Sequence, residues 1–257
     1  KELTLFYGRL SLGIMISAKS NEKVKALRAL AQKKCRRERG EYLVEGVKMV
    51  REAILSGQTI SLIAGLPETL AMLPETAAER IAVTRAVYDS ITDERTPQGV
   101  AAAVKMPVRP LAAPRGNALF LDGISDPGNL GTMIRTAVAA GFCEIYLADC
   151  ADPYNPKAVR ASMSGIYFAV LYEGSAEALL KTVDIPLIAA DMRGEDLFSF
   201  SPPARYAVAV GNEGRGLSDA VRARAAYTVG IPMRKEAESL NAAVSAAIMM
   251  YELSNRR

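Results

Sequence analysis

The 257-residue sequence contains no histidine, and it has only three cysteines. The absence of histidine excludes Ser-His-Asp and Cys-His catalysis, acid–base chemistry by imidazole, and zinc sites that use histidine. Cys35, Cys143 and Cys150 lack the Cys-x-x-Cys spacing of metal and redox sites, so we expect reduced thiols in a cytoplasmic protein. No convincing cluster of carboxylates is visible in the sequence, and we therefore expect no metal ion.

Long hydrophobic runs are absent as well, because no apolar stretch is long enough to cross a bilayer. The short apolar stretch from Leu10 to Ile16 is not followed by the small residues of a signal-peptide cleavage site. The segment that begins at Met15 has the character of a protein start. We therefore interpret residues 1–14 as an extension or an expression remnant without a function, and we expect no membrane partner.

The net charge is only +4, but the basic residues are distributed unevenly. Many of them lie near the amino terminus with few acids between them: Lys19, Lys23, Lys25, Arg28, Lys33, Lys34, Arg36, Arg37, Arg39 and Lys48. Such a surface suits the phosphate backbone of a nucleic acid. A solvated helix face explains the same charges equally well when charge alone is considered.

The sequence pattern predicts two α/β domains joined by a linker. Residues 15–105 alternate between short apolar runs and helical patterns, which is typical of a compact α/β domain. Within it, apolar residues at helical spacing predict a helix over Asn21–Arg37. Three prolines in residues 106–116 oppose regular structure and mark the linker.

Residues 117–257 form the second predicted domain. Its apolar runs are typical of parallel strands that are covered on both faces. The predicted strands are Ala118–Leu121, Glu144–Ala148, Ile185–Ala190, Tyr206–Val210 and Tyr227–Ile231. A closing helix is predicted over Glu238–Leu253, with an apolar stripe that consists of Leu240, Val244, Ala247, Ile248 and Tyr251.

Three separated blocks of this second domain combine glycine with polar side chains. They are Asp126–Arg135, Gly211–Gly216 and Ile231–Asn241, and each lies where an apolar strand gives way to a loop or helix. One such loop is ordinary turn chemistry. Because the carboxyl ends of parallel strands share one edge of a sheet, three such loops in order predict a composite site at that edge.

The first two blocks each contain a charged residue that requires an explanation. Asp126 is best explained as a helix cap. Arg135 lies two turns into the predicted helix, among small and apolar residues, where a charge either pairs with a carboxylate or serves a ligand. We favour the ligand. Glu213 is flanked by glycines and can turn toward Arg135, although a plain turn with a solvated glutamate explains it when it is taken alone.

The third block places polar residues at the predicted start of the closing helix. Free N–H groups at that position favour polar or anionic ligand atoms, which makes Ser239 and Asn241 candidates for a site. Glu236 and Glu238 are better explained as ordinary acids of the first helical turn. A polar helix entry where an apolar stripe is expected is itself an indication of a site.

In order and spacing, the three blocks resemble the signature motifs of the SpoU (TrmH-type) branch of the SPOUT methyltransferases, across the whole second domain. Residues 17–105, with Ser20-Asn21, Leu43-Val-Glu-Gly46 and Thr96-Pro-Gln-Gly99, resemble the L30e-like RNA-binding domain that often precedes it. The resemblance implies an α/β fold whose second domain has a mostly parallel sheet and a deep trefoil knot. It also implies a homodimer formed through that domain.

The activity implied by the resemblance is methyl transfer from S-adenosyl-L-methionine to a ribose 2′-hydroxyl of RNA. The family's catalytic and site positions match Asn129, Arg135, Glu213, Ser239 and Asn241. Its cofactor-binding positions match Gly211, Gly216, Ile231, Met233 and Leu240. The basic residues that we expect to bind RNA phosphates are Lys23, Lys33, Lys34, Arg36 and Arg37.

The implied mechanism is an in-line displacement, in which the 2′-hydroxyl attacks the methyl group. Arginine is a poor base because it stays protonated at neutral pH, so we interpret Arg135 as a clamp for a phosphate and the 2′-oxygen. In this scheme Glu213 orients Arg135 and Asn129 fixes the ribose. Much of the rate then comes from alignment of the two reactants.

One residue departs from the family pattern, because Lys235 stands where the family usually has glycine. Its side chain either reshapes the cofactor entrance or offers a cation to RNA. It also supports one alternative, a non-catalytic RNA-binding or ribosome-assembly factor. Methylation of transfer RNA on ribose or base is another alternative, and the Ser239–Asn241 block favours the ribose. A generic nucleotide-binding enzyme is disfavoured, because the loops lack a phosphate fingerprint.

We expect 23S ribosomal RNA as the substrate in preference to transfer RNA. The basic amino-terminal domain resembles those of large-subunit RNA methyltransferases, and this preference is an analogy between domains.

Overall fold

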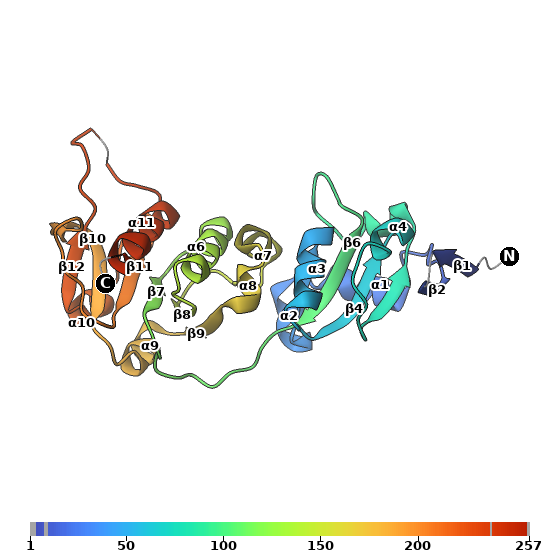
Figure 1. Ribbon diagram of the computed structural model, residues 1–257, viewed down its shortest axis with the longest axis horizontal. Coiled ribbons are helices and arrows are strands. Elements are labelled where there is room, and N and C mark those ends of the chain that lie inside the picture. Colours follow the sequence, from blue (N-terminus) through green and yellow to red (C-terminus); the bar gives the residue numbers. More distant parts are fainter. Residues whose placement is uncertain (1–3, 8–9, 237, 256–257) are drawn as a thin grey trace. The chain divides into compact units, whose positions relative to one another are not determined.

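The computed structural model describes residues 4–7, 10–236 and 238–255. The chain divides into two units, of which the first comprises Lys1–Pro107 with Tyr154–Arg160. The second comprises Val108–Pro153 with Ala161–Arg257. Each unit contains a β-sheet with helices on both faces, so the predicted fold class of two α/β domains is confirmed (Figure 1).

The first unit is built on a four-stranded sheet. In spatial order its strands are β3 (Glu41–Glu45), β6 (Val100–Lys105), β4 (Ile60–Gly65) and β5 (Glu79–Ala82). Strand β6 is antiparallel to both of its neighbours, whereas β4 and β5 are parallel. Residues before this sheet form two further strands, β1 (Thr4–Tyr7) and β2 (Leu10–Ile14), which pair with each other.

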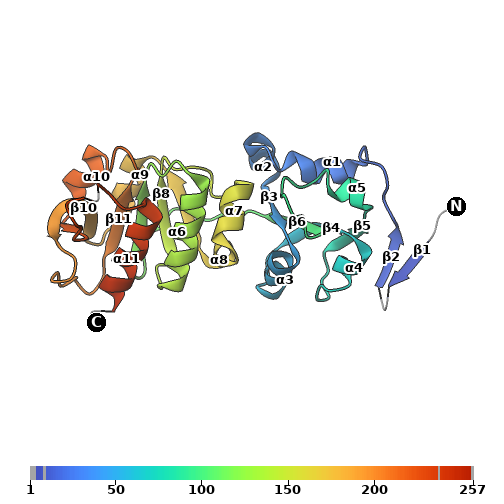
Figure 2. The ribbon, with the colours of Figure 1, turned by 90° about the horizontal axis from the view of Figure 1, so that it is seen from above.

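The helices of this unit cover both faces of its sheet (Figure 2). They are α1 (Glu22–Ala29), α2 (Lys33–Arg39), α3 (Val47–Leu55), α4 (Pro67–Leu70) and α5 (Arg85–Tyr88). The apolar residues of α1 and α5 pack with those of the sheet in one buried cluster that includes Leu27, Leu43, Tyr88 and Ala101. This cluster shows why the alternating pattern of the sequence produces a compact domain.

The single helix that was predicted over residues 21–37 is instead two helices, α1 and α2. Helix α1 ends at Ala29, and the carbonyl oxygens of Leu30 and Ala31 each accept a hydrogen bond of 2.8 Å from Arg36 Nη1. The guanidinium therefore satisfies carbonyl groups that a continuous helix would have bonded internally. These hydrogen bonds therefore account both for the break between α1 and α2 and for the burial of Arg36.

The second unit contains a six-stranded sheet in which every neighbouring pair is parallel. In spatial order the strands are β12 (Tyr227–Gly230), β10 (Leu187–Asp196), β11 (Ala207–Gly211), β7 (Ala118–Asp122), β8 (Glu144–Ala148) and β9 (Val170–Gly174). The central strand β7 is buried along its whole length, as the apolar runs predicted.

The helices of the second unit lie on opposite faces of this sheet. Figure 2 shows α6 (Pro127–Ala139), α8 (Gly165–Phe168) and α11 (Ala242–Ser254) on one face. Helices α9 (Ala176–Thr182) and α10 (Asp219–Arg224) lie on the other face. Helix α7 (Pro156–Ser162) is divided between the two units. Of the described residues, no helix is both long and apolar enough for a membrane span.

The closing helix differs from its prediction in its start and in its buried face. It begins at Ala242, so Glu236 and Glu238 precede it and are not acids of its first turn. Val244 and Tyr251 of the predicted stripe are 47% and 45% exposed. The buried residues are instead Ala242, Ala243, Ala246, Met249, Met250 and Leu253. Both faces of the helix are apolar, so the periodicity alone selected the wrong one.

Candidate active site

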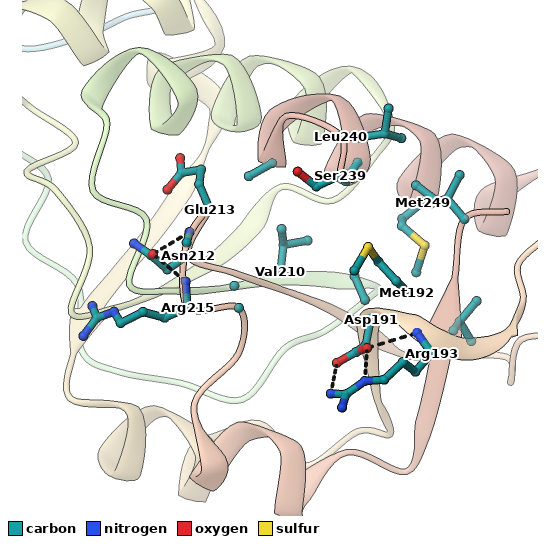
Figure 3. A pocket seen from close by; sticks show the side chains of 18 of the residues that line it. Asp191, Met192, Arg193, Val210, Asn212, Glu213, Arg215, Ser239, Leu240 and Met249 are labelled. Atoms are coloured by element: carbon teal, nitrogen blue, oxygen red, sulfur yellow. Dashed lines mark hydrogen bonds and ion pairs between the residues drawn. The ribbon is translucent and has the colours of Figure 1, made fainter. Parts of the chain in front are cut away.

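A cavity of about 510 Å³ lies at the carboxyl ends of β10, β11 and β12 (Figure 3). Its wall combines apolar side chains such as Val210 and Met249 with the glycine-rich backbone that follows β11. A volume of several hundred Å³ and a mostly apolar wall with a few polar groups are typical of sites for small ligands. Residues of the second and third sequence blocks thus line one cavity, whereas no residue of Asp126–Arg135 lines it.

The residues that were expected to bind a cofactor all lie on the wall of this cavity. They are Gly211, Gly216, Ile231, Met233 and Leu240. Glu213 and Ser239, from the expected catalytic set, also line it. Asn129, Arg135 and Asn241 are not among the lining residues.

The loop after β11 is a tight turn that requires glycine at two positions. Asn212 and Gly216 exchange two backbone hydrogen bonds of 3.1 and 2.8 Å. A Cβ atom on Gly211 would lie 2.2 Å from the carbonyl carbon of Gly216, a distance that no packing allows. Gly216 has a φ of +69°, which favours glycine. This turn presents bare backbone to the cavity.

The side chain of Asn212 holds the same turn in place. Its Oδ1 accepts hydrogen bonds from the backbone N–H groups of Gly214 and Arg215, at 2.9 and 3.1 Å. Its Nδ2 donates to the carbonyl oxygen of Gly123 at 2.8 Å, which ties the turn to the loop after β7. A fully bonded asparagine of this kind makes the loop rigid.

A chain of side-chain amides connects all three sequence blocks. Asn129 Nδ2 donates a 2.6 Å hydrogen bond to Glu213 Oε1, and Asn129 Oδ1 accepts one of 3.1 Å from Asn241 Nδ2. Asn241 is the N-cap of α11, and its Oδ1 accepts from the backbone N–H groups of Ala243 and Val244. The amide orientations are therefore defined by their partners, and the carboxylate is linked to the amino terminus of a helix.

Asp126 and Arg135 have different positions relative to this chain. Asp126 caps α6 by accepting a 2.8 Å hydrogen bond from the backbone N–H of Asn129, which confirms the capping role. Arg135 is exposed, and within the described part of the chain its side chain makes no hydrogen bond or ion pair. Glu213 is bonded to Asn129 rather than to Arg135. The expected pairing of Glu213 with Arg135 is thus not what the structure shows.

Lys235 does not lie on the wall of the cavity. It lines a neighbouring hollow of about 540 Å³ together with Arg234 and Glu238. Ser239, in contrast, lies on the cavity wall, just before the helix cap Asn241. The lysine at the usual glycine position is therefore outside the lining of the larger cavity around the Gly211–Gly216 turn.

Three charged residues on the cavity wall were not predicted from the sequence, namely Asp191, Arg193 and Arg222. Asp191 Oδ1 accepts from Arg193 Nε at 3.1 Å, and Asp191 Oδ2 is ion-paired with Arg222 Nη1. The hydrogen bonds from Arg193, and then that from Arg222, hold the pKa of Asp191 well below its ordinary value, although burial opposes this. The sequence feature that could have identified Asp191 and Arg193 is Asp191-Met192-Arg193, which directly follows the predicted apolar strand Ile185–Ala190.

The basic residues that were expected to bind RNA fall into two groups. Lys33, Lys34 and Arg37 of α2 are exposed. Arg36 is only 1% exposed and donates to backbone carbonyls, so the structure gives it a role in folding and not in binding RNA. Lys23 is about half exposed and is ion-paired with Glu79.

Among the described residues, no group of three or more cysteine, aspartate or glutamate side chains is arranged to hold a metal ion. The fold and the cavity together define an α/β protein with a cavity of small-ligand size at the carboxyl edge of a parallel sheet.

The chain belongs to the SpoU rRNA Methylase family, whose model matches residues 116–251. Residues 21–102 match a second model, the MRM3-like substrate binding domain. The 23S rRNA (guanosine(2553)-2′-O)-methyltransferase RlmP of Bacillus subtilis is 33% identical over 93% of this chain and 98% of its own length. The predicted resemblance to SpoU methyltransferases is therefore confirmed.

Two solved structures that carry the methyl donor AdoMet have the same fold. An rRNA methyltransferase from Sinorhizobium meliloti with bound AdoMet matches with a TM-score of 0.84 and 28% identity, over 94% of this chain and 97% of that one. The SpoU methyltransferase AviRb from Streptomyces viridochromogenes, in complex with AdoMet, matches with a TM-score of 0.79 and 27% identity, over 91% and 97%.

Proposed function

We propose that the protein transfers a methyl group from S-adenosyl-L-methionine to a ribose 2′-hydroxyl of ribosomal RNA, with 23S rRNA as the expected substrate. The observation that carries this proposal is the amide chain from Glu213 through Asn129 to Asn241, beside the cavity formed by the Gly211–Gly216 turn. It brings together all three sequence blocks of a family whose members include a 23S rRNA 2′-O-methyltransferase.

The cavity fits the cofactor in size and in chemistry. Gly211, Gly214 and Gly216 line the cavity without side chains, and the backbone of Gly216 leaves no room for a side chain on Gly211. Ile231, Met233 and Leu240 supply the apolar surface on which an adenine ring packs. The bound cofactor supplies an electrophilic methyl group on a positively charged sulfur.

Arg135 and Asn129 are proposed to prepare the ribose hydroxyl for attack. The exposed guanidinium of Arg135 is available for a phosphate of the RNA and for the 2′-oxygen as it gains negative charge. Arginine retains its proton at neutral pH, so we assign it electrostatic stabilisation and not the role of a base. Asn129 retains one free N–H on Nδ2 with which it can fix the ribose.

The RNA is proposed to be positioned by the exposed basic residues of α2, namely Lys33, Lys34 and Arg37. They offer phosphate contacts that orient the substrate without reading its sequence. The match of residues 21–102 to the MRM3-like substrate binding domain supports this assignment. Transfer RNA is the second candidate substrate, because the family includes relatives named tRNA/rRNA methyltransferases.

A homodimer formed through the second unit is also proposed, together with the trefoil knot of the SPOUT fold. Val244 and Tyr251 leave an apolar face of α11 exposed on a helix beside the cavity, which supports an interface there. Replacing Val244 by aspartate is expected to convert a dimer to a monomer in light scattering, whereas the same change at exposed Val108 in the linker is expected to leave the dimer intact.

The experiment that tests the proposed function measures transfer of labelled methyl from S-adenosyl-L-methionine to purified rRNA and tRNA. We expect label in rRNA with the wild-type protein and a loss of label with Arg135→Ala. The matched control is Arg205→Ala, because this exposed arginine donates to the carbonyl of Pro114 and does not line the cavity. Label in tRNA alone would identify tRNA as the substrate in place of rRNA. No label in either RNA would refute the proposed activity.

A further inference from the structure

Three charged side chains on the cavity wall are bonded to one another and take no part in the chemistry proposed above. Asp191 and Arg193 belong to β10, and Arg222 belongs to α10. All three line the cavity, and Figure 3 shows Asp191 and Arg193 on the side opposite Glu213. A carboxylate between two guanidinium groups inside a ligand cavity needs a role.

Asp191 lies where β10 leaves its regular pairing. Strand β10 pairs with β12 up to Ala190, and the register shifts before the pairing resumes at Glu195. Irregularities of this kind next to a site turn side chains toward it. The Asp191 carboxylate is thereby held at the carboxyl edge of the sheet, with its side chain only 11% exposed.

The acceptor positions of this carboxylate are filled by arginine. Oδ1 accepts from the backbone N–H and from Nε of Arg193, both at 3.1 Å. Oδ2 accepts from Arg193 Nη2 at 3.2 Å and from Arg222 Nη1. A carboxylate has about four acceptor positions, so no position remains for a ligand while Arg193 is bound.

The two arginines are held very differently. Arg222 is anchored, because its Nε also donates to the carbonyl of Leu217 at 3.0 Å and its side chain is 36% exposed. The side chain of Arg193 is 79% exposed and has Asp191 as its only bonding partner among the described residues. An ion pair with so exposed a partner contributes little stability, so Arg193 can be displaced.

We propose that Asp191 binds the 2′,3′-diol of the cofactor ribose, and that Arg193 covers the carboxylate until the diol displaces it. This inference rests on the proposed function. Asp191 follows the part of β10 that pairs in parallel with β11, Leu187–Ala189. An acidic side chain just beyond such a parallel-paired segment binds ribose hydroxyls in nucleotide sites of α/β sheets. Arg222 keeps the carboxylate ionised and in place, which makes it a strong acceptor for two hydroxyl donors.

Asp191 shares the cavity wall with the residues at which the two ends of the cofactor are proposed to lie. The apolar wall formed by Ile231, Leu240 and Met249 suits the adenine ring, and Glu213 marks the end at which methyl transfer is proposed. The ribose connects these two parts of the cofactor. A contact of Asp191 with the cofactor's α-ammonium group is the competing outcome of the test.

The test compares S-adenosylhomocysteine, the stable product of the reaction, with its 2′,3′-dideoxy analogue in calorimetric titrations. With the wild-type protein, loss of the diol is expected to weaken binding by about ten- to a hundred-fold, the effect of losing hydrogen bonds to a charged acceptor. With Asp191→Asn, both ligands are expected to bind with nearly the same weakened affinity. A loss of equal size for both ligands would assign Asp191 to the amino-acid part of the cofactor or to folding, and would overturn the proposal.

Arg193→Ala tests whether Arg193 competes with the ligand for Asp191, and it leaves the ion pair of Asp191 with Arg222 in place. Its removal is expected to raise the affinity for S-adenosylhomocysteine by up to about five-fold and to leave the dideoxy analogue unaffected. The matched control is Arg85→Ala, which removes a similarly exposed arginine paired with Asp89 in the first unit. A fall in affinity with Arg193→Ala would show that Arg193 binds the ligand and does not cover the carboxylate.

These results separate the two proposals. If the wild-type protein binds neither S-adenosyl-L-methionine nor S-adenosylhomocysteine, the proposed function fails. If it binds both but the diol contributes equally in the wild type and in Asp191→Asn, the proposed function stands and the inference about Asp191 fails.

Discussion

The sharpest prediction concerns Asn129, whose amide connects Glu213 with Asn241. Replacing it with alanine removes a donor to a carboxylate and an acceptor for a neighbouring amide at the same time. Because Asn129 is not among the residues that line the cavity, cofactor binding is expected to be unaffected. The change is therefore expected to lower kcat for methyl transfer and to leave the Kd for the cofactor as it was.

The size of the effect follows from the two hydrogen bonds. A bond to a charged group contributes about 1.5–3 kcal/mol and a neutral bond about 0.5–1.5 kcal/mol. Asn129 is only partly buried, so we take the lower end of both ranges, about 2 kcal/mol together. If both hydrogen bonds stabilise the transition state for methyl transfer, their loss lowers kcat about 30-fold.

The assay is single-turnover methyl transfer to rRNA, with cofactor affinity measured separately by calorimetry. Thr132→Ala is the matched control, because Thr132 is exposed on the same helix and donates only to the carbonyl of Gly128. Asn129→Asp is expected to be more damaging than alanine, since it would place a second carboxylate within 2.6 Å of Glu213 Oε1. A kcat within two-fold of the wild type for Asn129→Ala, or an equal loss of cofactor affinity, would refute the reasoning.

Three further predictions concern the first unit. Replacing Lys33, Lys34 and Arg37 together with glutamine is expected to weaken RNA binding and to flatten its dependence on salt, with a slope that falls by up to about one for each phosphate that is no longer neutralised; calorimetric titration with cofactor should be unchanged. Arg36→Ala is expected to lower the free energy of unfolding by about 2–4 kcal/mol in a urea titration, because two carbonyl acceptors lose a buried donor. Burial raises the pKa of Glu45 above its ordinary value of 4.5, so the free energy of unfolding falls as the pH rises from 4.5 through the raised pKa. Glu45→Gln is expected to reduce this fall in urea titrations across the same pH range. An unchanged pH dependence would contradict the prediction.

The composite site could be predicted because its signal is local. Each block joins glycine and polar residues directly after an apolar strand, and parallel strands bring their carboxyl ends to one edge of the sheet. That geometry placed Gly211, Ile231 and Leu240 on one cavity wall. The capping role of Asp126 was equally local, because it depends on the three residues that follow it.

The features that could not be predicted depend on contacts between distant segments. Glu213 bonds to Asn129 and not to Arg135, and the choice depends on the conformation of two loops. Arg36 looks like its exposed basic neighbours in the sequence, yet it is buried because α1 and α2 meet at its position. Asp191 was missed because β10 continues beyond its apolar run through a shift in register.

The most direct test of the central claim identifies the methylated atom. rRNA that has been methylated by the protein in vitro is digested to nucleosides and analysed by mass spectrometry, with unmodified rRNA as the control. We expect a single nucleoside that carries the added methyl group on its ribose 2′-oxygen, and about 30-fold less of it with Asn129→Ala at early times. A methyl group on a base, with the ribose unmodified, would contradict the account, because the site would then serve a different reaction of the same fold.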